Sequence, residues 1–175
     1  MIRFTRFFAL TLFFLLPLHL FSQKQFPQKQ LTDAEATMLS NLPELELPES
    51  LKVTDLPWRC DNADQPYLRP VFEQIGASCG QAAGVSYNFT YEINRARGLS
   101  ADTSINQYPT HFTYNFMNHY GYYGVSYLHS FEILRTLGSP TVEEYGGMAI
   151  NEDANIWVSG YDLYHGAMAN RIKSV

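Results

Sequence analysis

Cys79 has the clearest capacity for chemistry, because its thiol stands at the start of a segment whose pattern predicts a helix. The run Ser78-Cys79-Gly80-Gln81 fits a capping box, in which serine and glutamine side chains bind free backbone amides at a helix start. A cysteine attacks as its thiolate, and the partial positive charge of a helix N-terminus stabilises that anion. We therefore predict that Cys79 is a nucleophile in the first turn of a helix.

Gln74 stands five residues before Cys79, in a stretch whose glycine and small residues allow a tight loop against the helix start. Its side-chain amide, together with the Cys79 backbone amide, could donate to an oxyanion. Other interpretations stay open at this point. Gln74 could be an ordinary loop amide, and Cys79 could be a small buried hydrophobe or half of a disulfide with Cys60.

The histidines offer no evident base for such a nucleophile. None of His111, His119, His129 and His165 comes with a neighbouring Asp or Asn that would orient it across a cleft, so each is predicted to be structural. His129 and Glu132 share a helix face, which we interpret as surface capping or packing. The histidine spacings match no compact ligand motif, and the sequence predicts neither a metal nor a cofactor.

A helix over Cys79–Arg97 would position the thiol. Apolar residues recur there at steps of three and four, namely Ala82, Val85, Phe89, Ile93 and Ala96. Basic residues fall in the last turn, and Gly98 follows them as a stop signal. Further helices are expected over 109–118, 128–137 and 163–173, with glycine-tyrosine turns between them and little strand. The tyrosines of 108–127 are predicted to pack between helices, with a sugar- or peptide-binding face as the alternative.

The N-terminal residues predict export. Residues 1–22 carry two arginines and then an apolar run that is too short to span a bilayer, so they are predicted to be a signal peptide. An uncleaved anchor is the alternative. Residues 23–55 are polar and proline-punctuated, and we interpret them as a linker or pro-like segment in which Thr32 and Glu35 cap a short helix. The product would be secreted or periplasmic, without a stable membrane span once the signal is removed.

Charge and cysteine content narrow the class of protein. The whole chain has 12 basic and 17 acidic side chains, and removal of Arg3 and Arg6 with the signal leaves a net charge near −7. No basic block would remain to meet phosphates, so nucleic acid is not an expected partner. With only two cysteines, Cys60 and Cys79, a miniature scaffold held by disulfides is excluded.

Several runs resemble the opening of the papain-like cysteine peptidases, and in particular their divergent bacterial exported members. These runs are Leu56-Pro57, Asp61, Arg69-Pro70-Val71-Phe72-Glu73-Gln74, Gly76 and Ser78-Cys79, followed by Asn106–Asn115, Phe131–Gly138 and Pro140–Tyr145. The resemblance covers residues 56–175 and implies the N-terminal part of an α+β papain-like fold. This part is its mostly helical first domain, and the strand-rich second domain is expected to be missing. It also implies that Cys60 is a buried free thiol, because the matching position is ordinarily apolar.

The sequence departs from the family pattern at two points. Gly80 replaces the usual tryptophan after the nucleophile, and the spacing from Gln74 to Cys79 is one residue shorter than is common. In another register Cys79 matches the cysteine that precedes the nucleophile, which would leave Ala82 in the catalytic position and the domain inert. The helix-start pattern favours Cys79 as the nucleophile.

In this family the histidine base lies about 130–150 residues beyond the cysteine, on the second domain. Only 96 residues follow Cys79 here, so the resemblance implies a truncated chain that lacks its base and is inactive alone. The expected function is exported cysteine-type endopeptidase activity on protein or peptide substrates. Alternatives are a non-catalytic exported binding or scaffold module derived from the same fold and, more weakly, an acyl-transfer enzyme such as a transglutaminase- or amidase-like relative.

Overall fold

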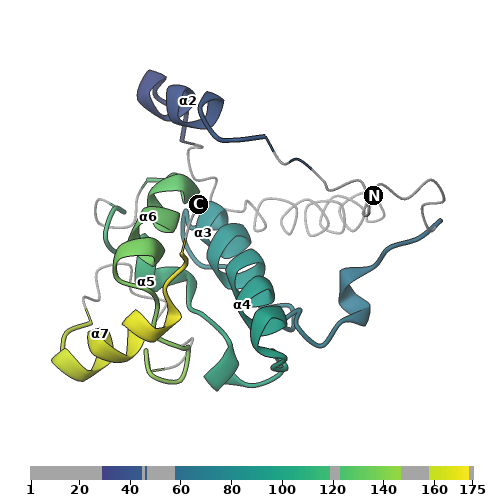
Figure 1. Cartoon of the computed structure of the whole chain (residues 1–175). Coiled ribbons are helices and arrows are strands. Elements are labelled where there is room, and N and C mark those ends of the chain that lie inside the picture. The colour runs from purple at the N-terminus through teal and green to yellow at the C-terminus, as the bar shows by residue number, and fades with distance from the viewer. Residues whose placement is uncertain (1–28, 45, 47–57, 119–122, 147–157, 174–175) are drawn as a thin grey trace, which may run out of the picture.

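The structure is a computed structural model that describes residues 29–44, 46, 58–118, 123–146 and 158–173 (Figure 1). Within these ranges the regular structure is helical and contains no β-strand. The α-helices are α2 (Asp33–Ser40), α3 (Cys79–Gln81), α4 (Thr90–Arg97), α5 (Thr110–Tyr114), α6 (Tyr127–Thr136) and α7 (Tyr161–Ala167). Three short 3₁₀-helices are η3 (Asn62–Asp64), η5 (Ser104–Asn106) and η7 (Met168–Asn170), and η4 (Ala82–Phe89) is a π-helical segment. The predicted signal peptide lies outside the described residues.

One continuous helix runs through α3, η4 and α4, as the sequence predicts for Cys79–Arg97. Its middle section, η4, is wound as a π-helix. It ends at Gly98, whose φ of 67° is left-handed and suits a residue without a side chain. Figure 1 shows this helix crossing the molecule, with α5, α6 and α7 to one side of it. The thiol-bearing residue therefore begins the longest helical segment described.

The core forms between this helix and the elements that pack beside it. Val85, Phe89, Tyr108 and Leu134 make a buried cluster, with Ile93, Phe131 and Ile172 packed against it. The predicted apolar stripe accordingly faces the core from Ala82 to Ile93, whereas Ala96 is exposed. Burial of these side chains favours the folded chain because it removes apolar area from water.

A second row of the same helix is buried although its members are polar. Ser86 donates to the Tyr108 carbonyl oxygen at 3.1 Å, the Thr90 hydroxyl accepts from the Tyr108 amide at 3.2 Å, and Asn94 donates to the Asn106 carbonyl oxygen at 2.7 Å. Buried polar groups need such partners to offset desolvation. Together with Gln81, these residues form what we call the buried polar row, and each member is fixed to the backbone or side chain of another segment.

The other predicted helices are present with different bounds. The helix expected over 109–118 is confined to α5 and gives way to turns after Tyr114. The helix expected over 128–137 is α6, which begins one residue earlier because Ser126 accepts from the Leu128 amide as its cap. The helix expected over 163–173 starts at Tyr161 and is replaced from Met168 by the tighter turn η7.

The segment after α7 is fixed to the helical body. Arg97 donates to the Asn170 side-chain oxygen at 2.8 Å, and Asn170 donates to the Ser139 carbonyl oxygen at 2.9 Å. Gly138, with a φ of 77°, lies so close to this segment that an added Cβ would be 1.8 Å from the Ala167 carbonyl oxygen. The C-terminal segment is thus held against both α4 and the end of α6.

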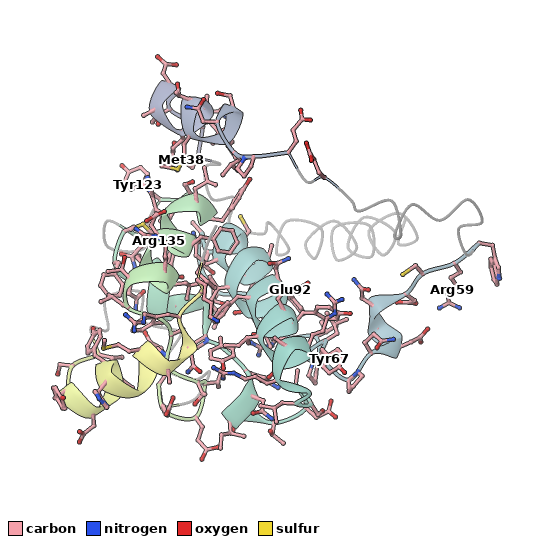
Figure 2. The ribbon with its side chains drawn as sticks, in the orientation of Figure 1. Met38, Arg59, Tyr67, Glu92, Tyr123 and Arg135 are labelled. Atoms are coloured by element: carbon pink, nitrogen blue, oxygen red, sulfur yellow. The ribbon has the colours of Figure 1, made fainter. Side chains whose placement is uncertain are left out.

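Residues 58–64 project from the body as an exposed arm, on which Figure 2 labels Arg59. Cys60 lies on this arm and is exposed, so the expectation of a buried Cys60 is wrong. The physical reason is local: Trp58, two residues away, is 95% exposed, and Asp61 caps η3 in contact with Arg59. No packed surface is therefore available to cover the thiol.

The short helix α2 forms as the sequence predicts. Thr32 and Glu35 make a reciprocal capping box, because the Thr32 hydroxyl accepts from the Glu35 amide and the Glu35 carboxylate accepts from the Thr32 amide. Across the part of the chain that is described, no helix is long and apolar enough to cross a bilayer.

Candidate active site

A cavity of about 340 Å³ lies at the start of the long helix and brings Cys79 and Gln74 together in one lining. Cys79 is exposed and is the first residue of α3. The other lining residues come from three segments far apart in sequence, namely Lys29 and Leu31, then Gly76, Ala77 and Gly80, and finally Gly124, Val125, Ser126 and Tyr127. Both residues singled out in the sequence as candidates for acyl chemistry therefore reach the same space.

The predicted capping box at this helix start is wrong. Ser78 makes no side-chain hydrogen bond to the helix, and its hydroxyl donates instead to the Ile75 carbonyl oxygen at 2.8 Å. Gln81 turns away to donate to the Val125 carbonyl oxygen at 2.9 Å and to the Ser130 hydroxyl at 3.3 Å. A carbonyl three residues earlier binds Ser78, and partners from distant segments bind Gln81, so neither side chain is left for the capping box. The amides of the first helical turn, which have no intrahelical partner, thus lack a side-chain cap from Ser78.

Gln74 lies on the exposed side of the cavity. Its side-chain amide donates to the Gly76 carbonyl oxygen at 3.1 Å, so the amide is held within its own loop. Gly76 has a φ of 72°, which the loop needs in order to turn back toward the helix. An oxyanion bound at Cys79 would have to draw this donor from Gly76, and the role of Gln74 as an oxyanion donor remains a prediction.

Tyr114 connects the loop before Cys79 with the segment that leads to Val125. Its ring is fully buried, and its hydroxyl donates to the Tyr123 carbonyl oxygen at 3.3 Å. Burial raises the pKa of this phenol, a hydrogen bond with the Ala77 backbone acts in the opposite direction, and the nearby Cys79 adds to the increase. The neutral hydroxyl is therefore a stable bridge between the cysteine loop and the segment that leads to Val125.

Gly80 allows the helix to approach the opposite side of the cavity closely. A Cβ at Gly80 would lie 3.2 Å from the Val125 carbonyl oxygen and 3.9 Å from the Tyr127 Cβ. One turn later, a Cβ at Gly84 would lie 3.4 Å from the Tyr127 Cβ, which is an ordinary contact. The absence of a side chain at position 80 thus has a packing reason, since a large side chain there would meet the Val125 backbone.

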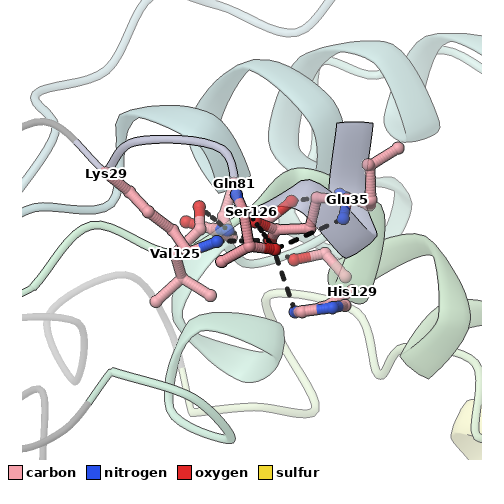
Figure 3. Close-up of polar contacts among 9 residues, drawn as sticks. Lys29, Glu35, Gln81, Val125, Ser126 and His129 are labelled. Carbon is pink, nitrogen blue, oxygen red and sulfur yellow. Dashed lines mark hydrogen bonds and ion pairs between the residues drawn. The ribbon is translucent and has the colours of Figure 1, made fainter. Parts of the chain in front are cut away.

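A polar cluster of Lys29, Glu35 and His129 borders the cavity (Figure 3). Glu35 is buried, with a carboxylate that accepts from the Lys29 ammonium group and the Thr32 amide. These hydrogen bonds lower the pKa of Glu35 to about 2, and the bond from Lys29 has the largest effect. Burial alone would raise the pKa. His129 Nδ1 lies 4.0 Å from the same carboxylate. Glu35 of α2 thus lies beside the first turn of α6.

The described histidines do not line the cavity. His129 faces Glu35, whereas its predicted face partner Glu132 pairs with Arg135. His111 is buried against the Tyr114 ring, and the exposed His165 stacks on Tyr161. His119 lies outside the described residues, which also hold no group of three or more acidic, cysteine or histidine side chains that could bind a metal ion.

The two cysteines are both free and exposed. The alternatives of a buried Cys79 and of a Cys60–Cys79 disulfide are therefore not what the structure contains. Cys60 lies on the exposed arm, whereas Cys79 lines the cavity. The same functional group therefore has different surroundings at the two positions.

Comparisons of the chain with protein-family models, with curated proteins and with solved structures found no match. The resemblance to papain-like peptidases accordingly rests on the quoted residues alone. Several cavity residues were not predicted from the sequence, among them Lys29, Leu31 and the segment Gly124–Tyr127. Nothing in their local pattern signals this position, because the cavity is formed by segments that meet only in the folded chain.

Proposed function

We propose that this chain is part of an exported cysteine-type endopeptidase in which Cys79 is the nucleophile. The observation that carries the proposal is the exposed Cys79 thiol at a helix start, opening on a cavity that Gln74 also lines. A helix N-terminus stabilises a thiolate, and a neighbouring cavity gives a substrate carbonyl room to approach. A peptide or protein segment is the proposed substrate.

In the proposed reaction the Cys79 sulfur attacks the peptide carbonyl carbon, and the thiol proton passes through a base to the leaving amine as the C–N bond breaks. Water then hydrolyses the thioester and restores the thiol. The Cys79 amide and the Gln74 side chain would hold the oxyanion. Because the described histidines do not line the cavity, the base would be supplied by a residue outside the described ranges or by another polypeptide.

A second candidate is a non-catalytic binding module, and the specific observation that favours it is the absence of an imidazole from the described lining. In that case the cavity would bind a peptide side chain without reaction at Cys79. Both candidates rest on the papain-like fold that the sequence resemblance implies. The two candidates differ in whether the Cys79 thiol is activated.

Alkylation of the two thiols in one molecule separates the candidates. We expect iodoacetamide to modify Cys79 faster than Cys60 by about tenfold at pH 6–7, because the unpaired amides of a helix start favour attack by the sulfur and an exposed arm supplies none. Mass spectrometry of the digested chain measures both rates. C60S should leave the Cys79 rate unchanged, and C79S should abolish labelling by an epoxysuccinyl probe. Equal rates at the two cysteines would favour the binding module.

A further inference from the structure

We infer that Gln81 is a positioning residue that fixes the side of the cavity opposite Cys79 and so sets which groups reach the thiol. The inference rests on the proposed function, in which Cys79 is the nucleophile. Gln81 is fully buried, two residues after Cys79 on the same helix. Its side chain connects that helix to Val125, a lining residue from a segment 44 positions away.

The chemistry of the contact fixes the orientation of the Gln81 amide. The Val125 carbonyl oxygen only accepts hydrogen bonds, so the Gln81 Nε2 must face it, as it does at 2.9 Å. The same nitrogen donates to the Ser130 hydroxyl at 3.3 Å, which ties the contact to α6. Gln81 Oε1 is buried without a partner among the described residues. A buried unpaired acceptor is costly, so the two hydrogen bonds donated by Nε2 must offset that cost.

Gln81 also acts where the helix that begins at Cys79 lies close to the Val125 backbone. Gly80, which precedes it, already brings the helix to the Val125 carbonyl oxygen, the same atom that Gln81 binds. The Figure 3 view shows Gln81 and Val125 beside Ser126, another lining residue. Without this hydrogen bond, Val125 would no longer be bound to the helix that begins at Cys79, and the cavity would widen.

The other members of the buried polar row provide a matched control. Asn94 is also a buried amide on the same helix, donates to a backbone carbonyl oxygen at 2.7 Å and leaves its Oδ1 unpaired among the described residues. Its partner is Asn106, which does not line the cavity. Loss of either amide should cost comparable stability, but only the loss of Gln81 should change access to Cys79.

The test uses two thiol reagents of equal chemistry and different size, N-methylmaleimide and N-phenylmaleimide, on the full chain. For each variant, the rate with N-phenylmaleimide is divided by the rate with N-methylmaleimide at each cysteine. The quotient at Cys79 is then divided by the quotient at Cys60, which lies on the exposed arm and serves as the internal reference. In Gln81→Met we expect this relative rate of the phenyl reagent to rise about fivefold, whereas Asn94→Leu should leave it within about twofold of the native chain. An unchanged ratio in folded Gln81→Met, or an equal change in both variants, would overturn the inference.

A measurement on the native chain keeps the inference testable should Gln81→Met not fold. Side-chain amide protons of Gln81, observed by NMR, should shift when N-phenylmaleimide modifies Cys79, and those of Asn94 should not. Absence of a Gln81 shift would count against the inference. Both maleimides modify any accessible thiol, so these outcomes are independent of whether Cys79 reacts faster than Cys60, which is what the proposed function requires.

Discussion

At the scale of single residues, Cys79 and Cys60 show how surroundings determine what one functional group can do. Both thiols are free and exposed. Cys79 begins a helix and faces a cavity, whereas Cys60 lies on an arm beside the fully exposed Trp58. The amides of the first turn at Cys79 have no intrahelical partner, and the exposed arm offers Cys60 no such donors. The difference in reactivity predicted for the two cysteines follows from position alone.

Tyr114 should stabilise the cysteine loop through its hydroxyl. We expect Tyr114→Phe to lower the free energy of unfolding by about 1–3 kcal/mol, because the hydroxyl's hydrogen bonds to the Tyr123 carbonyl and the Ala77 backbone would be lost in a buried site. The same variant should change the rate at which iodoacetamide modifies Cys79. Urea unfolding and mass-spectrometric labelling measure the two effects.

Tyr145→Phe is the matched control for Tyr114→Phe. The Tyr145 hydroxyl accepts from Asn115 at 3.2 Å, and Tyr145 does not line the cavity. Its removal should reduce stability and leave the Cys79 labelling rate unchanged. If both phenylalanine variants altered that rate equally, the hydroxyl of Tyr114 would have no special relation to the cysteine loop.

At the scale of elements, the long helix shows what a sequence can and cannot predict. Its bounds follow from apolar periodicity and from Gly98, signals that are local to the segment. The prediction of a capping box is wrong because Ser78 donates to the Ile75 carbonyl oxygen and Gln81 donates to the Val125 carbonyl oxygen. Ser86 and Asn94 look like solvent-facing polar residues, yet they are buried because other segments supply their hydrogen-bond partners. Such partners cannot be inferred from spacing within one helix.

The position of α2 should depend on pH through Glu35. This carboxyl has a pKa of about 2 against an ordinary value of 4.5, chiefly because Lys29 donates to it. A lowered pKa in the folded chain stabilises the fold above pH 4.5, and that contribution is lost as the pH falls through 2. An NMR titration of the Glu35 carboxyl carbon should therefore have its midpoint near 2, together with the amide shifts of α2.

Lys29→Met should raise the midpoint of the Glu35 titration, because it removes the largest cause of the lowered pKa. Lys173→Met removes a lysine outside the polar cluster and should leave the midpoint unchanged. A native midpoint near 4.5 would show that Lys29 and Glu35 are not paired, and α2 would then lack its polar contact with the cavity region.

At the scale of the whole molecule, the described chain is a helical body whose distant segments meet around two places. One is the cavity, where the residues near 30, 79 and 125 converge. The other is the junction where Arg97, Ser139 and Asn170 are joined by hydrogen bonds. The sequence predicted the helices near each place but not how the distant segments meet there, since the partners on those segments, such as the Val125 and Ser139 carbonyls and the Asn170 side chain, have no pattern in the sequence. The papain-like architecture remains a proposal that such contacts neither require nor oppose.

The packing of the C-terminal segment, residues 158–173, against the end of α6 should depend on the absence of a side chain at Gly138. A Cβ there would lie 1.8 Å from the Ala167 carbonyl oxygen, and its φ of 77° is already strained for any side chain. We expect Gly138→Ala to lower the free energy of unfolding by about 2–4 kcal/mol and to expose residues 158–173 to limited proteolysis. Gly98→Ala is the matched control, because φ at Gly98 is also positive (67°) but nothing lies within 4 Å of the added Cβ. That variant should cost only the backbone strain of about 1 kcal/mol and leave the segment protected. Equal losses in the two variants would mean that the C-terminal segment is not packed against Gly138.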